Sequence, residues 1–248
     1  MKPIKGYGLQ TWSVRDHLQK DYIKGLEELK AMGYSGLEFA GYGGLSAEAL
    51  KAEMERIGLR SIASHTNPDA IKGDGLKREL EYCAKAGIGA LILPCVIIKT
   101  YDEALATAEM LSRMGEEGKQ YGILAGFHNH GFEFVDENGI YSVDYIMENT
   151  DPETVFLEQD IFWTEHAGKD HIEYLKRHKE RTKLIHLKQR GADGSNPELP
   201  DGILDIKKVI EIAQGFGIDE FIVEQEGYPS GDSMKSAKID IDYLNDLF

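Results

Sequence analysis

The sequence is poor in cysteine, in basic residues and in long hydrophobic runs. Its 248 residues include two cysteines, Cys83 and Cys95, which are too few for a disulfide scaffold and more typical of a reducing compartment. No stretch approaches the roughly 18 consecutive apolar residues of a membrane span, and the first residues show no apolar run typical of a signal peptide. We therefore expect a cytoplasmic protein that has no membrane partner.

Basic residues are outnumbered by acidic ones, 28 to 43, which gives a formal net charge of −15. Proteins that bind nucleic acid usually present a basic face that replaces phosphate counterions, so the charge argues against a nucleic-acid partner. The segment GLQTWSVRD near the N-terminus contains no GxGxxG pattern, and this argues against a dinucleotide-binding fold.

A short pattern recurs along the chain: a helical segment ends, a glycine follows, then an apolar residue, then a run typical of a β-strand. The glycines of this pattern are Gly33, Gly58, Gly87, Gly122 and Gly217. Glycine adopts the left-handed conformation just past a helix end at no steric cost. The first four lie about one α/β unit apart, roughly 30 residues. The pattern therefore predicts repeated alternation of strands and helices.

Eight strands are predicted, and eight α/β units favour a closed barrel over an open doubly wound sheet. They lie near Tyr7–Trp12, Gly36–Phe39, Arg60–Ser64, Ala90–Leu93, Leu124–His128, Val155–Gln159, Leu184–Leu187 and Phe221–Glu224. The length also suits this architecture. We predict an α/β fold, a single (β/α)8 TIM barrel that forms one catalytic domain over residues 1–248.

Each of the last four predicted strands ends in two polar residues spaced i, i+2. The pairs are His128 with His130, Glu158 with Asp160, His186 with Lys188, and Glu224 with Glu226. A period of two places both members of a pair on the same side of a strand. Active sites of TIM barrels lie at the carboxyl ends of the strands. If these side chains point inward, eight polar groups converge at the mouth of one barrel.

Such a cluster is costly to bury without compensation, which a divalent cation supplies. We predict a metal site formed by His128, Asp160, His186 and Glu224. Two imidazoles and two carboxylates suit Mn²⁺, Zn²⁺, Co²⁺ or Fe²⁺ better than Ca²⁺, and Mg²⁺ is kept as a further candidate. The alternative is a polar network without a metal.

Other residues near the predicted strand ends could contact a substrate, or could equally serve packing. They are Trp12, Glu38, His65, His130, Glu158, Trp163 and Arg190. Lys188 shares the strand side of His186 and could bind an anionic or carbonyl group. Cys95 is interpreted as a packing residue. Four further histidines are expected on the surface or in loops: His17, His166, His171 and His178.

At these residues the chain resembles the xylose isomerase-like TIM barrels, specifically the sugar phosphate isomerase/epimerase group. The segments that carry the resemblance run from GLQTWSVRD through GFHNHGFEF and LEQDIFW to IHLKQR and FIVEQE. The resemblance implies a metal held by Glu, Asp, His and Glu from strands five to eight. The last three correspond to Asp160, His186 and Glu224. His128 stands where those relatives have a glutamate, and Glu133 matches a position that contacts substrate hydroxyls.

Residues and resemblance together predict a sugar isomerase or epimerase that abstracts a proton next to a carbonyl through a metal-stabilised enediolate. Glu224 would be the general base, His128 or Glu133 would return a proton, and Lys188 would stabilise the oxyanion. One alternative is a lyase or dehydratase that acts on a keto-sugar, keto-glycoside or inosose. The others are a non-catalytic sugar-binding barrel and, least favoured, a DNA repair enzyme similar to endonuclease IV. A small carbohydrate is the expected partner, and a homodimer is left open.

Overall fold

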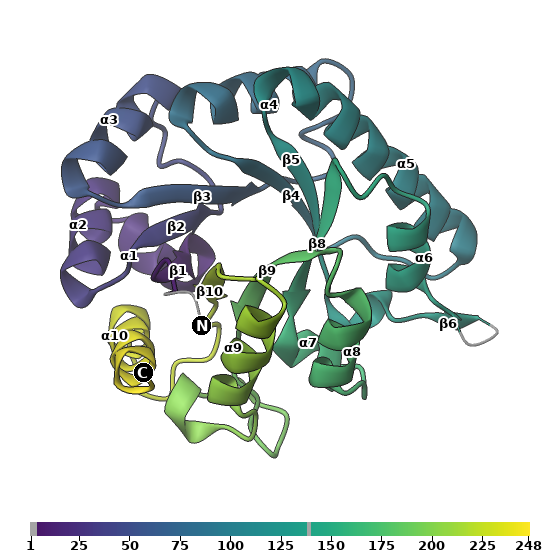
Figure 1. Ribbon diagram of the computed structural model, residues 1–248. Coiled ribbons are helices and arrows are strands. Elements are labelled where there is room, and N and C mark those ends of the chain that lie inside the picture. The colour runs from purple at the N-terminus through teal and green to yellow at the C-terminus, as the bar shows by residue number, and fades with distance from the viewer. Residues whose placement is uncertain (1–3, 138–139) are drawn as a thin grey trace.

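The computed structural model describes residues 4–137 and 140–248, and its centre is a closed barrel of eight parallel strands (Figure 1). The strand order around the barrel is β1-β10-β9-β8-β5-β4-β3-β2, and β1 pairs with both β10 and β2 to close it. The barrel strands are β1 (Tyr7–Gln10), β2 (Gly36–Phe39), β3 (Arg60–His65), β4 (Ala90–Pro94), β5 (Leu124–His128), β8 (Val155–Asp160), β9 (Thr182–Leu187) and β10 (Phe221–Val223). The predicted TIM barrel is confirmed.

Helices form the outer layer around this barrel (Figure 1). The α-helices are α1 (Arg15–Leu18), α2 (Tyr22–Met32), α3 (Ala47–Ile57), α4 (Gly75–Ala86), α5 (Tyr101–Gly118), α6 (Ser142–Glu148), α7 (Ile161–His166), α8 (His171–His178), α9 (Ile206–Gly215) and α10 (Ser233–Asp246). Short 3₁₀ turns are η1 (Thr11–Val14), η2 (Lys119–Tyr121), η3 (Gly131–Glu133) and η4 (Leu199–Asp201), and β6 (Asp136–Glu137) pairs with β7 (Ile140–Tyr141) outside the barrel.

Helix ends follow the residue chemistry of the sequence. The Ser46 side chain accepts a hydrogen bond from the backbone N–H of Ala49 and so caps the start of α3, because the first N–H groups of a helix have no partner within it. Gly33 and Gly58 end α2 and α3 in the left-handed conformation, with φ of 118° and 79°. This is the helix-ending role that the recurring glycine pattern predicted.

The barrel interior below the strand ends is filled with hydrophobic side chains, so it is a core and not a pore. A separate buried cluster occupies this space: Ala63, Ala90, Ile92, Phe156, Leu184 and Ile222. Gly126 on β5 leaves room for it, since a Cβ there would clash with the side chains of Ile92 and Phe156. This layer supports the polar residues that lie at the carboxyl ends of the strands.

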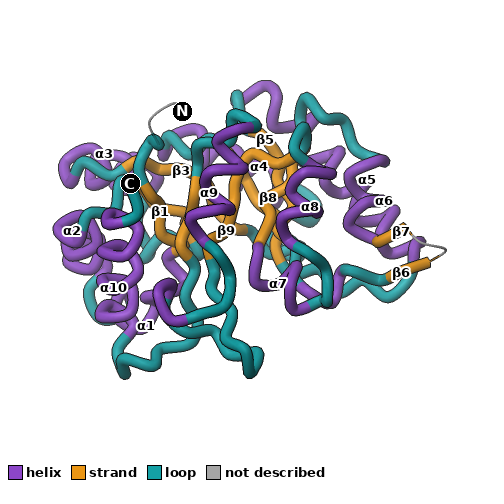
Figure 2. The backbone as a smooth tube through the Cα atoms, turned by 60° about the horizontal axis from the view of Figure 1, so that its bottom comes forward, coloured by secondary structure: helices purple, strands orange, loops and turns teal. Residues whose placement is uncertain are grey.

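The carboxyl ends of the strands lie on one side of the barrel. The helices α1 and α7, which follow β1 and β8, both lie on the lower side in Figure 2. The carboxyl ends of five strands differ from the predicted bounds, and β3 and β4 each run one residue further than predicted. Trp12 does not end β1 but lies in η1, β8 continues to Asp160, and β10 stops at Val223, just before Glu224.

Two of the histidines expected on the surface are buried instead. His178 lies inside α8 with its Nε2 atom 2.7 Å from Asp144 Oδ1. His171 begins the same helix, and its Nδ1 atom lies 2.6 Å from Glu165 Oε1. Both lie on the face of α8 that also buries Tyr174 and Leu175. In each residue a carboxylate binds one ring nitrogen, which lowers the cost of burial.

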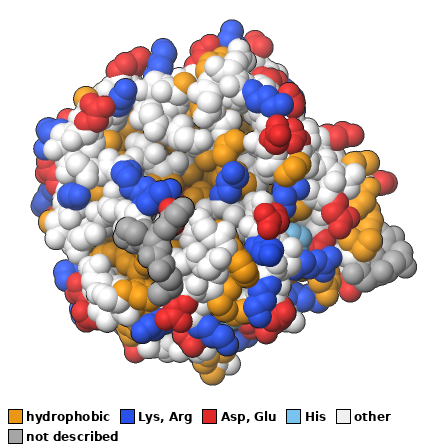
Figure 3. Space-filling model, in the orientation of Figure 1, with side chains coloured by type: hydrophobic (Ala, Val, Ile, Leu, Met, Phe, Trp, Pro, Cys, Tyr) orange, Lys and Arg blue, Asp and Glu red, His pale blue; other side chains and the backbone are white. Residues whose placement is uncertain are grey.

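None of the described helices combines the length and the apolar character that crossing a membrane requires. The face of the molecule in Figure 3 shows acidic and basic side chains interspersed around a central hollow in which hydrophobic side chains gather.

Candidate active site

The four predicted polar pairs converge at the carboxyl end of the barrel. His128, Glu158, Asp160 and His186 belong to β5, β8 and β9 and are fully buried or nearly so. Their neighbours Lys188 and Glu224 directly follow β9 and β10 and are also buried. Adjacent parallel strands place equivalent positions side by side; Asp160 pairs in register with His186, for example. Barrel closure therefore brings together residues that are far apart in the sequence.

Four of these residues form what we call the strand-end cluster: His128, Asp160, His186 and Glu224. Each offers one ligand atom, and these atoms all lie within 4.8 Å of one another. His128 Nε2 lies 4.0 Å from Asp160 Oδ2, and His186 Nδ1 lies 3.3 Å from Glu224 Oε2. This is the set predicted from the sequence as metal ligands.

The strand-end cluster fits a divalent cation. Asp160 Oδ2 is buried and has no hydrogen-bond partner in residues 4–137 or 140–248, and a buried polar atom without a partner requires compensation. The other oxygen, Oδ1, accepts the backbone N–H of Trp163 and fixes the carboxylate. Two imidazole nitrogens and two carboxylate oxygens match the donor preferences of Zn²⁺, Mn²⁺, Co²⁺ and Fe²⁺.

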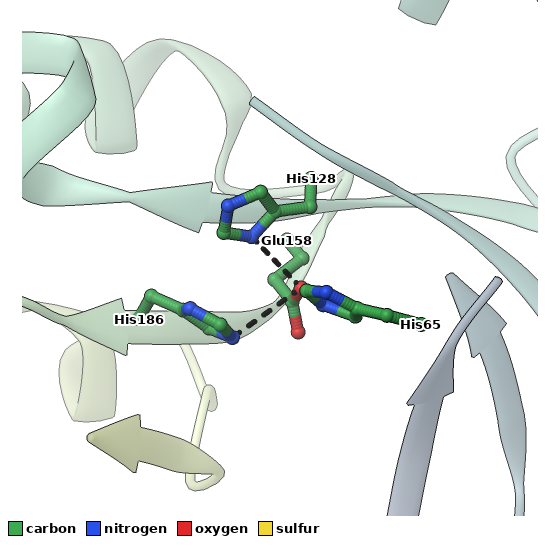
Figure 4. Close-up of side chains that lie close together, drawn as sticks. All are labelled: His65, His128, Glu158 and His186. Carbon is green, nitrogen blue, oxygen red and sulfur yellow. Dashed lines mark hydrogen bonds and ion pairs between the residues drawn. The ribbon is translucent and has the colours of Figure 1, made fainter. Parts of the chain in front are cut away.

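A second group, the inner cluster, lies deeper in the barrel and shares two imidazoles with the first. Its members are His65, His128, Glu158 and His186 (Figure 4). The three imidazoles surround the Glu158 carboxylate: Glu158 Oε2 lies 3.0 Å from His128 Nδ1, 3.0 Å from His65 Nε2 and 3.4 Å from His186 Nε2. This group could also hold a metal by its atom types.

Glu38 extends the inner cluster from the end of β2. Its Oε2 atom lies 2.7 Å from His186 Nε2 and 3.0 Å from His65 Nε2, and it accepts a hydrogen bond from Gln10 Nε2 at 2.8 Å. Glu38 and Gln10 are both fully buried. The inner cluster and these two residues form a continuous polar layer beneath the strand-end cluster.

The carboxylates of this layer determine which nitrogen of His128 and of His186 faces the strand-end cluster. His128 directs Nδ1 to Glu158 and Nε2 to Asp160, and His186 directs Nε2 to Glu38 and Nδ1 to Glu224. A carboxylate only accepts hydrogen bonds. With a cation bound by Asp160 and Glu224, Glu158 and Glu38 would favour an N–H on the inward nitrogen of each ring, and the lone pairs of His128 Nε2 and His186 Nδ1 would face the strand-end cluster.

The imidazoles of the inner layer supply positive charge to its two carboxylates. Burial alone would lower the pKa of His65, but the carboxylates of Glu38 and Glu158 raise it to about 10. Burial and Glu38 raise the pKa of Glu158, yet the surrounding imidazoles hold it at about 2. A cationic His65 thus lies between two carboxylates. An imidazole binds two metal ions only when it loses its N–H, so the shared rings favour one ion.

Above the strand-end cluster, Lys188 is the one buried ammonium group among the described residues. It lies 3.3 Å from Glu224 Oε2 and also contacts Glu226, and these carboxylates with Asp160 raise its pKa against the effect of burial. Its Nζ atom lies 5.0 Å from the ring centre of Trp163. Burial raises the pKa of Asp160 to about 7, although Lys188 opposes this rise.

A hollow of about 340 Å³ opens beside the two clusters and is lined by Trp12, Ala40, His65, Pro94, Cys95, His128, His130, Glu224 and Glu226. Of the residues predicted to contact a substrate, Trp12, His65 and His130 line it. Glu38, Glu158, Trp163 and Arg190 are not among its lining residues.

Glu133, in η3, is not among the residues that line this hollow. It is fully buried, and both of its carboxylate oxygens accept backbone N–H groups, one from Val96 and one from His130. Burial raises its pKa to about 8, although the two backbone hydrogen bonds oppose this rise. In this position Glu133 joins the loop after β4 to the loop after β5.

Three residues of the site were not singled out from the sequence as site residues. Gln10 and Asn129 are fully buried, and Asn129 bonds to the backbone of Asp160 through both ends of its amide. Cys95 was interpreted as packing, but it is exposed, lines the hollow and has a φ of 52°. The available signal was its position directly after a strand end, next to Pro94.

Comparison with known proteins agrees with this fold. A sequence profile of the family described as "Xylose isomerase-like TIM barrel" matches residues 26–247. A crystal structure from Parabacteroides distasonis, described as a sugar phosphate isomerase/epimerase, is 30% identical with a TM-score of 0.85, and the match covers 97% of this chain and 98% of that chain.

Curated relatives match over shorter stretches. An inosose dehydratase of Geobacillus thermodenitrificans is 28% identical in an alignment 142 residues long, and the match covers 48% of this chain and 46% of the relative. An inosose dehydratase of Lacticaseibacillus casei is 29% identical in an alignment 150 residues long, and the match covers 53% of this chain and 50% of the relative. The chain thus spans about half the length of the curated relatives it matches.

Proposed function

Because the chain belongs to the xylose isomerase-like TIM barrel family, we propose that it is a divalent-metal-dependent enzyme that removes a proton next to the carbonyl of a sugar. The observation that carries this proposal is the strand-end cluster, in which His128, Asp160, His186 and Glu224 meet beside an accessible hollow. Relatives described as isomerase/epimerases and as dehydratases both support this class of reaction.

The strand-end cluster would hold one cation, through His128 Nε2, Asp160, His186 Nδ1 and Glu224. When bound there, the cation supplies positive charge that acidifies a carbon-bound proton next to a carbonyl. The inner layer keeps the two imidazoles turned toward this position, and Trp163 and Asn129 fix the Asp160 side chain and backbone.

Glu224 is the proposed general base. It belongs to the strand-end cluster and also lines the hollow, so it reaches both the ligand position and the substrate. Lys188 and His186 hold the pKa of Glu224 well below its usual range, against the effect of burial, so the carboxylate is ionised and ready to accept a proton. A base must lie within reach of the proton it removes.

Lys188 would stabilise the negative charge that develops on the carbonyl oxygen. Its ammonium group lies 3.3 Å from Glu224 Oε2. Its pKa lies above the usual value, so it stays charged throughout the reaction. A fixed charge in a buried site needs little reorganisation when the transition state forms, which is why it is effective there.

The group that returns the proton determines the product. Both nitrogens of His128 are engaged in this arrangement, and both oxygens of Glu133 accept backbone N–H groups. His130 lines the hollow, and its buried Nδ1 has no hydrogen-bond partner among the described residues. Transfer through a single base, Glu224, suits isomerisation or loss of a β-substituent, whereas epimerisation needs a second group such as His130 on the opposite face.

A dehydratase or lyase is therefore the second candidate. It is favoured by the replacement of a family glutamate by His128, which leaves Glu224 as the one glutamate in the cluster, and by the partial similarity to inosose dehydratases. A non-catalytic sugar-binding barrel would not need the ionised Glu224 beside a buried lysine. An endonuclease IV-like activity is not supported by the net charge of −15.

The test is NMR in D₂O with the metal-loaded protein and a panel of keto-sugars, keto-glycosides and inososes. We expect deuterium to enter at a carbon next to a carbonyl, or a β-substituent to leave, and Glu224→Gln to reduce either rate at least about 100-fold. The matched control is Glu220→Gln, which changes a carboxylate at the other end of β10. Exchange by Glu224→Gln at the rate of the unmodified protein would contradict the base assignment.

A further inference from the structure

A second hollow of about 180 Å³ lies beside the first one. It is lined by Thr11, Trp12, Arg15, Leu18, Gln19, Tyr22, Ala40, Gly41, Tyr42 and Gly43. Trp12 and Ala40 line both hollows. The second hollow is formed by the turns after β1 and β2, so it adjoins the candidate active site at the carboxyl end of the barrel.

The shared wall is an exposed tryptophan that is held in place. Trp12 is 44% exposed. Its Nε1 donates to Glu226 Oε1 at 3.2 Å, and its backbone N–H donates to Gln10 Oε1 at 3.0 Å. The Arg15 guanidinium lies 4.3 Å from the ring centre. A large apolar side chain kept both exposed and fixed is suited to stacking against a ligand.

The aromatic rings beside Trp12 are also fixed by contacts. The Tyr22 hydroxyl donates a hydrogen bond to the carbonyl of Gly41. The loop after β2 packs so closely on the Tyr22 ring that a Cβ at Gly43 would clash with the ring. Tyr42 stacks on Tyr82 with ring centres 4.1 Å apart. The second hollow is thus a preformed pocket with three aromatic walls, which lowers the cost of ordering on binding.

The side chains around the second hollow are unsuited to a phosphate group. The first hollow has two carboxylates among its lining residues, and its positive charge would come from Lys188 beside Glu224 and from the proposed cation. The second has one charged residue, Arg15, which donates to the Trp12 carbonyl at 2.7 Å and to Tyr228 Oη at 3.2 Å. Phosphate sites in proteins use several donors, often with bidentate arginine.

We propose that the two hollows form one site for an uncharged sugar that carries an aromatic substituent, with the sugar in the first hollow and the substituent in the second. This inference rests on the proposed function, which places the reacting carbons beside Glu224. The size is suitable, because an engineered protein cavity of about 150 Å³ already binds benzene.

The experiment compares phenyl and methyl glycosides of glucose and galactose, with glucose 6-phosphate as a third probe, for binding to the metal-loaded protein by calorimetry. We expect the phenyl glycosides to bind about tenfold or more tightly than the methyl glycosides. Gln19→Trp fills the second hollow and should reduce this preference to about twofold or less. The matched control, Lys20→Trp, changes the neighbouring residue, which is not among the lining residues of either hollow, and should keep it.

Equal binding of phenyl and methyl glycosides, or no binding of either, would overturn the proposal. So would tighter binding of glucose 6-phosphate that is lost in Arg15→Met, because that result identifies the second hollow as an anion site. Deuterium exchange on keto-sugars is measured independently of these probes. Its failure would count against the proposed function, and its success together with equal glycoside binding would count against the second hollow alone.

Discussion

Replacement of Glu158 by glutamine should weaken metal binding without removing a metal ligand. In the structure Glu158 Oε2 lies 3.0 Å from His128 Nδ1 and favours an N–H on that nitrogen. The amide of a glutamine can instead donate a hydrogen bond to Nδ1. The proton then moves to Nε2, the nitrogen that faces Asp160, and the lone pair that would bind the cation is lost for that fraction of molecules.

The size of the effect follows from the number of contacts that are lost. Glu158 holds one of the two imidazole ligands directly, and Glu38 continues to hold the other. Loss of such an orienting carboxylate typically lowers metal affinity about 10- to 100-fold, or roughly 1.4–2.8 kcal/mol. Asp160→Asn removes a ligand charge from the strand-end cluster itself, so we expect it to weaken binding more strongly than Glu158→Gln.

Zn²⁺ affinity, measured by competition with a chromophoric chelator, tests this ranking. ¹⁵N NMR of the histidine rings in the Zn²⁺-loaded protein reports the tautomer directly, and we expect N–H on Nδ1 of His128 and on Nε2 of His186. Glu220→Gln is the control, since that carboxylate pairs with Arg60 at 2.7 Å and not with the site.

The reasoning is refuted if Glu158→Gln abolishes metal binding while Asp160→Asn leaves it intact. That result would place the ion in the inner cluster. Unchanged affinity in Glu158→Gln would equally refute the orienting role. Two bound ions per chain, with one lost in Glu158→Gln, would show that both clusters hold metal.

Three further predictions concern stability and charge. Burial raises the pKa of Asp240 from 3.8 to about 7. The stabilising contribution of its protonated form is therefore complete below pH 3.8 and is lost as the pH rises through 7. Urea unfolding at pH 5 and 8 should show this loss as about 2–3 kcal/mol, and Asp240→Asn should remove it. Gly126→Ala should lower the free energy of unfolding by about 1–3 kcal/mol, because the added methyl overpacks the barrel interior. Gly89→Ala, whose Cβ meets no atom closer than 3.8 Å, should be nearly neutral by the same assay, and an equal cost in both would contradict the packing argument. Lys188→Met should reduce kcat about 100-fold or more without weakening metal binding, and parallel losses of both would contradict its assigned role.

The barrel could be predicted from the sequence because its signals are local. Glycines such as Gly58 mark the ends of α2, α3 and α4, and the strands are short apolar runs in the sequence. The polar pairs could also be predicted from local sequence. Two residues spaced i, i+2 on a strand lie on the same side of it, whichever strands pair with it. The end of β1 was misplaced because Trp12 and its neighbours are compatible with a strand, and the 3₁₀ turn is fixed by the Gln10 side chain.

The depth of each polar residue could not be predicted, because it depends on how strands are staggered around the closed barrel. Glu158 and Asp160 face the same side of β8, yet Glu158 lies one step deeper, next to Glu38 from a distant strand. The register shift between β8 and β9 at Leu157/Glu158 contributes to this placement. The pairing of β1 with β2 places Gln10 beside Glu38, so barrel closure brings both residues to the site.

The most direct test of the site is anomalous X-ray diffraction from a crystal of the Zn²⁺- or Mn²⁺-loaded protein. The account predicts a single peak per chain, coordinated by His128 Nε2, Asp160, His186 Nδ1 and Glu224, with Glu158 and Glu38 still bonded to the inward nitrogens of the two rings. A peak coordinated by His65 and Glu158, or protein that takes up no divalent cation, would contradict it.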